Sequence, residues 1–247
     1  MKFKILLEYD GTGYSGWQKQ KNAKSIQGTL IDSIYTIFKA SKAKNEFTDL
    51  QGSGRTDSGV HAYGQVAHLE CQTMLGPEIL KLKLNDILPS SINILDVDKA
   101  DHRFHARHSA KSREYIYRIA KRRTAFEKKY VWWVKDKLNI GKMKECAALM
   151  VGMHDFISFT DKNNTEPSTK VLVESIEVSE TPELIIIKIR ASHFLWKMVR
   201  RVVGVLAECG RGNYNHKDIT RFLNSYSEEP AAFTAPPSGL FLNKVYY

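Results

Sequence analysis

Hydrophobic and polar residues alternate with a period of two in several short stretches, and in others the hydrophobic residues recur every three or four positions. The first pattern is typical of half-buried strands, and the second is typical of amphipathic helices. Strands are predicted over residues 2–9, 65–70, 92–97, 114–119 and 240–246, with a hairpin of 171–178 and 184–191. Helices are predicted over residues 25–40, 77–88, 140–151, 194–208 and 216–224, the first with Ser25 as its N-cap.

The order of these elements interleaves strands and helices twice, on either side of a charged crossover near residues 100–112. We therefore expect an α+β protein of two similar halves, residues 1–105 and 106–247, with a site between them. No segment approaches the 18 or so apolar residues of a membrane span, and the first residues lack the apolar core of a signal peptide.

Charge changes this picture most. The chain has 37 basic and 27 acidic residues, a net charge of +10. Such an excess favours nucleic acid or an anionic membrane as the partner. The three cysteines, Cys71, Cys146 and Cys209, contain no Cys-x-x-Cys pair, so reduced thiols in a cytoplasmic protein are expected.

One polar turn carries candidate chemistry: Gly54-Arg55-Thr56-Asp57-Ser58-Gly59-Val60-His61-Ala62. Glycines let a backbone approach a ligand closely, and Arg55 is placed to hold the Asp57 carboxylate ionised. By itself the turn also allows a purely structural Asp, whose side chain shapes the bend. The neighbouring Arg and His and the basic surroundings favour a reactive carboxylate.

A second glycine-rich segment, residues 11–16, matches the spacing G-x-G-x-x-G after a strand. A dinucleotide site needs a helix to open at once, and the residues that follow lack helical periodicity. We therefore expect a flexible loop that offers Tyr14, Trp17 and Lys19 to nucleic acid.

Residues 102–123 form a basic window with a single acid, Glu114. Its charges suit an RNA backbone, and aromatic residues of the adjoining strand suit an unstacked base. Three histidines, His102, His105 and His108, invite a metal site, but no convergent carboxylates and no His-Glu-x-x-His accompany them.

The predicted helix 194–208 is apolar around most of its circumference. Its polar positions are Lys197, Arg200, Arg201, Gly204 and Glu208. Buried arginines need partners, because an unpaired buried charge is costly. Either this stripe faces solvent, or one arginine reaches the Asp57 carboxylate.

At these residues the chain resembles the TruA family of tRNA pseudouridine synthases over nearly its whole length. The motifs are Tyr9-Asp10-Gly11 with Gly16-Trp17-Gln18, Gly54-Arg55-Thr56-Asp57 with Gly59-Val60-His61, Phe104-His105-Ala106-Arg107, Arg113-x-Tyr115-x-Tyr117, Gly152-x-His154-Asp155-Phe156-x-Ser158-Phe159, Met198-Val199-Arg200, and Gly239-Leu240-x-Leu242-x-x-Val245-x-Tyr247. Ser58 departs from the usual Ala of the family.

The resemblance implies two related, ferredoxin-like α/β halves around a mixed, mainly antiparallel sheet, with a basic cleft between them. It implies a homodimer that isomerises uridine to pseudouridine at positions 38–40 of tRNA, without a cofactor or a metal. It also implies Asp57 as the essential carboxylate, Arg200 as its partner and Tyr115 as a residue packed on the target base. Arg55 is then placed to contact phosphate or to fill the space that the target nucleotide leaves.

Two other functions compete with this prediction. A non-catalytic RNA-binding protein on the same scaffold would not need Asp57, Tyr115 and Arg200 together. A dinucleotide-dependent enzyme would rest on the early glycine pattern alone.

Overall fold

The backbone forms two units, each of which contains both strands and helices. The structure is a computed structural model that describes residues 1–41, 44–161 and 168–247. Unit 1 consists of Met1–Lys111 with Leu242–Tyr247, and unit 2 consists of Ser112–Phe241. Strands and helices alternate in both units and most strand pairs are antiparallel, so the predicted α+β class is confirmed.

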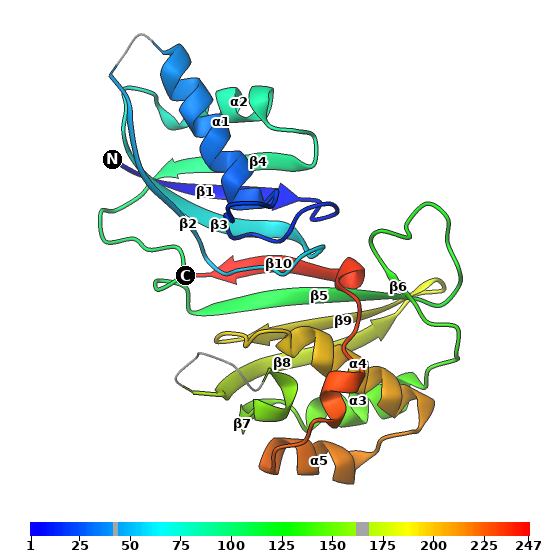
Figure 1. Cartoon of the computed structure of the whole chain (residues 1–247). Helices are drawn as coiled ribbons and strands as arrows, with labels where there is room; N and C mark the ends of the chain where they lie inside the picture. The colour runs from blue at the N-terminus through cyan, green and yellow to red at the C-terminus, as the bar shows by residue number, and fades with distance from the viewer. Residues whose placement is uncertain (42–43, 162–167) are drawn as a thin grey trace. The chain divides into compact units, whose positions relative to one another are not determined.

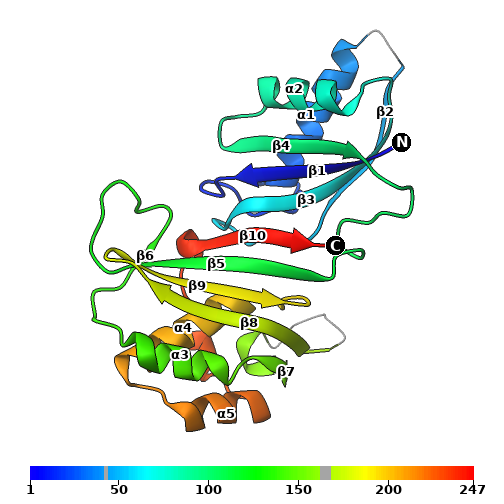
Figure 2. The same cartoon turned by 180° about the vertical axis from the view of Figure 1, so that it is seen from behind.

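Unit 1 has its strands in the order β4-β1-β3-β10, and β2 pairs with the second half of β3. Helices α1 and α2 cover one face of these strands, which Figures 1 and 2 show from opposite sides. Its elements are β1 (Lys2–Tyr9), α1 (Ile26–Ala40), β2 (Glu46–Gly52), β3 (His61–Gln72), α2 (Pro77–Ile87), β4 (Ile92–Lys99) and, from Leu242 on, β10 (Leu240–Tyr246).

The core of unit 1 follows directly from the alternation in β1. Phe3, Ile5 and Leu7 are buried, and the residues between them are half-buried. Leu30 and Ile34 of α1 are also buried, as the helical spacing predicts. The Ser25 side chain accepts a hydrogen bond from the backbone N–H of Gly28, so the predicted N-cap is confirmed.

Unit 2 has the strand order β5-β9-β8-β7, with β6 parallel to β5. Helices α3 and α4 lie along one face of this sheet (Figure 1). Its elements are β5 (Ser112–Ala120), β6 (Trp132–Trp133), α3 (Ile140–Ala148), β7 (Gly152–Asp155), η1 (Ile157–Phe159), β8 (Lys170–Glu180), β9 (Leu184–Ala191), α4 (Met198–Arg211), α5 (His216–Asn224), α6 (Glu229–Ala232) and η2 (Pro237–Gly239).

Helix α4 begins later than the apolar pattern predicts. The prediction placed its start at Phe194, but the first helical residue is Met198, and Lys197 before it has a left-handed backbone with φ +62°. A non-glycine residue in this region costs about 1–2 kcal/mol, so the surrounding structure must hold it in place. Trp196 and Lys197 therefore form a turn that leads into the helix.

The cysteines form no disulfide in the structure. Cys71, Cys146 and Cys209 are free and buried, as expected. Burial raises the pKa of the Cys71 thiol to about 11, so it stays protonated. Within the described residues, no helix is both long and apolar enough to cross a bilayer.

Candidate active site

The turn that carries Asp57 connects β2 to β3. The backbone N–H of Val60 donates to the carbonyl oxygen of Asp57 at 3.1 Å, which closes the bend. Gly59 has φ +76°, a left-handed conformation that glycine adopts without strain. Asp57 is half-buried in this turn and Arg55 is exposed.

The early glycine-rich loop packs directly behind this turn. A Cβ on Gly11 would lie 2.0 Å from the carbonyl oxygen of Val60, and a Cβ on Gly16 would lie 2.4 Å from that of Thr56. The backbone N–H of Trp17 donates to the same Thr56 oxygen at 3.0 Å. Only glycine fits at these two positions, because the two backbone segments are in direct contact there. Helix α1 begins only at Ile26, so the loop lacks the helix that would bind a pyrophosphate.

The expectation of an exposed aromatic loop is wrong for two of its three residues. Tyr14 is 3% exposed and Trp17 is 1% exposed, so neither ring can stack on a base. The Tyr14 hydroxyl shares a hydrogen bond of 2.9 Å with Ser91, and Lys24 lies over the Tyr14 ring. The alternation of aromatic and basic residues in the sequence did not reveal that these two rings belong to the core.

A buried polar network supports the turn from the sheet. The hydroxyls of Tyr9 and Thr56 share a hydrogen bond of 2.8 Å, and burial raises the pKa of Tyr9 to about 12. Gln65 donates to the carbonyl oxygen of Gly54 at 3.1 Å and accepts from the Ser53 hydroxyl at 2.6 Å. Buried polar groups of this kind are satisfied by one another, which fixes the backbone on both sides of Arg55. No local sequence pattern assigns Tyr9 and Gln65 to the site.

His61 closes the same turn on its other side. Its ring is buried, and Nδ1 accepts a hydrogen bond of 3.1 Å from the backbone N–H of Gly11. The Asp10 carboxylate lies 3.1 Å from the same nitrogen. The histidine beside Asp57 thus ties the glycine-rich loop to the start of β3.

In unit 2, Tyr115 lies on β5, opposite Ile189 of β9. Its side chain is 9% exposed. The ring of Phe194 meets it at 5.0 Å between centroids and 85°, an edge-to-face contact that favours one ring orientation. Tyr117 points to the same face of the strand, two residues along.

Arg200 is clamped to an irregular segment after α6. Its Nε donates to the carbonyl oxygen of Ala235 at 2.6 Å, and the backbone N–H of Ala235 donates to the carbonyl oxygen of Arg200 at 3.0 Å. The Tyr117 hydroxyl donates to the neighbouring Pro236 carbonyl at 2.7 Å. Burial raises the pKa of Tyr117 well above its ordinary value, although the positive charge of Arg200 acts to lower it.

The other charges predicted on α4 also have partners. Arg201 is buried, donates to the carbonyl oxygen of Thr160 and lies 3.9 Å from the Asp161 carboxylate. Glu208 is buried and accepts from Arg211 and Asn213. The expectation that buried arginines on this helix need partners is confirmed for Arg201. Asp57 belongs to unit 1 and Arg200 to unit 2, and the contact between them stays a prediction.

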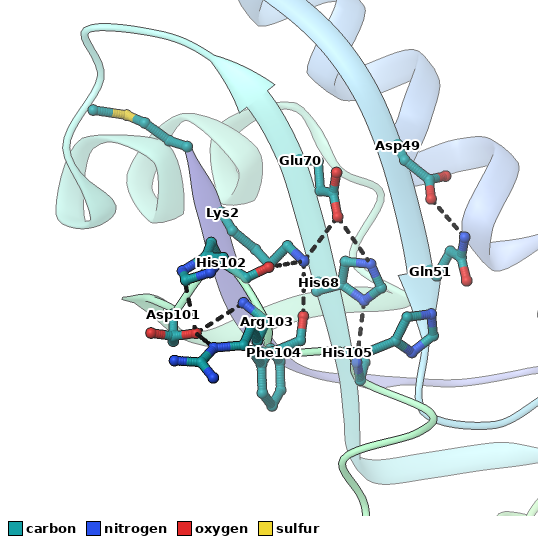
Figure 3. Close-up of polar contacts among 12 residues, drawn as sticks. Lys2, Asp49, Gln51, His68, Glu70, Asp101, His102, Arg103, Phe104 and His105 are labelled. Carbon is teal, nitrogen blue, oxygen red and sulfur yellow. Dashed lines mark hydrogen bonds and ion pairs between the residues drawn. The ribbon is translucent and has the colours of Figure 1, made fainter.

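The basic window splits between the two units. Residues 101–109 form a connecting segment of unit 1, while β5 belongs to unit 2. Figure 3 shows how unit 1 holds the segment: the Lys2 ammonium lies between the Glu70 carboxylate and the carbonyl oxygens of His102 and Phe104, at 2.8–2.9 Å. This ammonium group lowers the pKa of Glu70.

Histidines hold the same segment by accepting hydrogen bonds. Nδ1 of the buried His68 accepts from the backbone N–H of Ala106 at 3.1 Å (Figure 3). Nδ1 of His105 accepts from the N–H of Arg107 at 3.1 Å. Burial is the main cause that lowers the pKa of both rings, so their neutral forms are favoured. No group of three or more potential metal ligands converges in the part of the chain that the structure describes.

Comparison with known proteins places this chain. A sequence model of the family described as tRNA pseudouridine synthase matches residues 5–109 and 146–247. A protein named tRNA pseudouridine synthase A from Thermoanaerobacter sp. (strain X514) is 38% identical over 245 residues, 98% of each chain. Proteins of the same name from Ehrlichia chaffeensis and Bartonella tribocorum are 37% and 36% identical over 251 residues, with 99–100% of each chain covered. The chain therefore belongs to the TruA family of tRNA pseudouridine synthases, and it is an enzyme of the isomerase class.

Proposed function

We propose that this enzyme converts uridine to pseudouridine in the anticodon stem-loop of tRNA, at positions 38–40, without a cofactor. The observation that carries the proposal is the Asp57 turn. Two glycines bring a second backbone into contact with it, and a buried polar network holds it from the sheet. A carboxylate on a turn fixed from two sides is pre-oriented for a reaction, which lowers the entropy cost of reaching the transition state.

The reaction breaks the bond between N1 of uracil and C1′ of ribose and joins C5 of the same uracil to C1′. The proton on C5 is then lost and N1 gains one, so atoms and electrons balance without an oxidant or reductant. Asp57 either attacks the sugar or removes a proton from it to give a glycal. Both roles need the ionised carboxylate, and an unperturbed Asp with a pKa near 3.9 is ionised at neutral pH.

We assign the other site residues by their environments. Tyr115 packs against the target base, and its edge-to-face contact with Phe194 holds the ring ready for it. Arg200 supplies the positive charge that keeps the Asp57 carboxylate ionised. Arg55 is exposed and suits a contact with phosphate or the space that the target nucleotide leaves.

The target base must leave its stack before Asp57 can reach the ribose beneath it. Unstacking costs a few kcal/mol, and binding of the tRNA backbone must offset that cost. The net charge of +10 is suited to this task. We propose that two ferredoxin-like halves form a basic cleft, and that a homodimer places one tRNA across both subunits in the cytoplasm.

The experiment that tests the function compares Asp57→Asn and Asp57→Ala with Asp86→Asn, a change at an exposed carboxylate on α2. We expect both Asp57 variants to bind tRNA nearly as well as the wild type and to form no pseudouridine. The Asp86 variant should match the wild type in both measurements. Appreciable turnover by either Asp57 variant would remove this residue from the chemistry.

A further inference from the structure

Unit 2 presents an exposed aromatic ring on a basic loop that the proposed site does not use. Residues 121–131, here called the Phe126 loop, connect β5 to β6 and form the wide green loop above the β6 label in Figure 1. The Phe126 side chain is 96% exposed. The loop contains five basic residues and one acid: Lys121, Arg122, Arg123, Lys128, Lys129 and Glu127.

The base of the Phe126 loop is fixed by the sheet. Ile119 and Ala120 of β5 pair in parallel with Trp132 and Trp133 of β6, so the two ends of the loop are held side by side. The backbone N–H of Lys121 also donates to the carbonyl oxygen of Glu183 at 2.9 Å, next to the β8–β9 turn. The loop therefore leaves the sheet from a defined position.

Ion pairs and a turn hold the rest of the loop. Lys121 pairs with Glu180 at 2.8 Å and Arg122 pairs with Glu183 at 3.0 Å. Glu127 accepts from Arg118 of β5 at 3.0 Å, and its carbonyl oxygen accepts from the N–H of Tyr130 at 2.8 Å. Phe126 lies directly before this braced residue, so its ring is displayed from an ordered turn.

The surroundings of Phe126 decide which occupant fits. A protein interface is built on a contiguous apolar patch, but the residues next to the ring are small or charged: Thr124 and Ala125 precede it, and Glu127 and Lys128 follow it. Proteins that bind single-stranded nucleic acid combine positive charge along the backbone path with aromatic rings on which bases stack. Lys121 and Arg122 are already opposed by glutamates, and Lys129 has an interaction of its own. Arg123 and Lys128 are therefore the exposed charges best suited to phosphates.

We infer that the Phe126 loop binds tRNA by stacking Phe126 on an unpaired base while Arg123 and Lys128 contact the adjacent phosphates. The inference rests on the proposed function, because it takes tRNA as the substrate. It adds a binding element outside the catalytic set of Asp57, Tyr115 and Arg200.

The test measures the Kd of the full chain for unmodified tRNA and the KM and kcat for pseudouridine formation. Phe126→Ala should raise Kd and KM by about 5- to 150-fold, the effect expected for one stacked base, and leave kcat at saturating tRNA unchanged. Phe126→Trp keeps a flat ring and should restore binding, whereas Phe126→Leu keeps apolar bulk without a ring face and should not. Tyr35→Ala, at an exposed aromatic residue on α1, is the matched control and should bind as the wild type does.

The phosphate contacts have their own readout. Arg123→Gln and Lys128→Gln should each reduce the slope of log Kobs against log salt by about 0.7, the value for one neutralised phosphate of a single strand. Phe126→Ala should lower affinity without changing that slope.

Several results would overturn the inference while the proposed function stands. They are an unchanged Kd and KM for Phe126→Ala, binding by Phe126→Leu at the wild-type level, or a changed oligomeric state of Phe126→Ala with normal tRNA affinity. If instead the wild type forms no pseudouridine, the proposed function fails. A loss of tRNA binding in Phe126→Ala would then still support the loop as an RNA-binding element.

Discussion

Replacement of Gly204 by alanine tests how α4 and the segment that holds Arg200 depend on each other. A Cβ at Gly204 would lie 1.6 Å from the carbonyl oxygen of Phe233 and 2.6 Å from its carbonyl carbon. Ordinary contact begins near 3.4 Å, so the oxygen must retreat by about 1.8 Å. Both obstructing atoms are backbone, and no change of side-chain rotamer relieves the clash.

The effect on stability is the difference between two contributions. Overpacking of a filled site costs about 1–3 kcal/mol. Alanine in place of glycine within a helix returns about 0.5–1 kcal/mol. Because both obstructing atoms are backbone, the overpacking cost lies in the upper part of its range, about 2–3 kcal/mol. The free energy of unfolding should therefore fall by about 1–2.5 kcal/mol, which lowers Tm by about 2–10 °C for a chain of this size.

The effect on catalysis follows from the clamp between Arg200 and Ala235, two residues after Phe233. A displaced Ala235 carries the Arg200 guanidinium with it. A misplacement of about 1 Å at a catalytic group can cost about 100-fold in rate, so we expect kcat to fall by about that factor. The Kd for tRNA should change little, because one shifted charge among many phosphate contacts is a small part of binding.

Thermal unfolding and tritium release from C5 of uridine-labelled tRNA, assayed well below Tm, separate these effects. Gly141→Ala in α3 is the control, because its Cβ meets only the Asn139 side chain, at 3.2 Å, within the described surroundings. A wild-type Tm for Gly204→Ala would refute the packing argument. A lowered Tm with wild-type kcat would refute the link from this contact to Arg200.

Three further predictions address the base, the tRNA backbone and the histidine contacts. Tyr115→Phe keeps the ring on Phe194 and removes only the hydroxyl, which we expect to assist removal of the C5 proton. The variant should bind tRNA normally but turn over more slowly; a wild-type rate would exclude the hydroxyl from that step. The affinity for tRNA should fall steeply with added salt, by about 0.7–0.9 in log Kobs per log salt for each phosphate contact, and a flat titration would contradict the basic cleft. Burial and the charge of His105 lower the pKa of His68 below 6.5, so the stability from its neutral ring is complete above that pH and declines as the pH falls through the lowered folded pKa. Urea unfolding at pH values between about 8 and about 5 measures this decline in stability. The decline should be smaller in His68→Gln, whose amide oxygen still accepts from the Ala106 N–H. An equal decline in the variant would assign the titration to another group.

The elements that the sequence predicts best are those with local signals. The helix predicted at residues 216–224 is confirmed at both ends. Its start has a local signal, the capping box of Asn215 and Asp218, whose two residues are three apart in the sequence. Strand β1 and helix α1 are also confirmed, because the spacing of their hydrophobic residues is regular over eight or more residues.

The strand β2 was not predicted, and a bulge explains why. Its register on β3 shifts between Phe47 and Asp49. Phe47 and Leu50 are three residues apart, yet the extra residue between them places both on the inner face of the strand. Phe47 contacts Tyr35 of α1, and Leu50 is buried. A period of two is absent from such a strand, so alternation cannot reveal it.

The start of α4 and the role of the glycine-rich loop were wrong for a different reason. The apolar pattern continues through Phe194, but the left-handed backbone at Lys197 prevents a helix there. Tyr14 and Trp17 resemble surface aromatics in sequence, and only the approach of Gly11 and Gly16 to the turn at residues 56–60 places them in the core. Both errors concern contacts between distant residues, which a local pattern does not contain.

The path of the chain through unit 1 has a consequence for how the protein is made. Strand β10 lies beside β3, where Gly64 leaves room for the carbonyl oxygen of Asn243, and the Tyr247 hydroxyl donates to the Ala106 carbonyl at 2.9 Å. On the ribosome, the β4-β1-β3 part of this sheet is synthesised first but waits for β10 until all of Ser112–Phe241 has been translated. Unit 1 can therefore complete its strand pairing only after the whole of unit 2 has been translated, against the usual N-terminal order. The edge of β3 is left unpaired during that interval, when nascent chains are most open to wrong pairing.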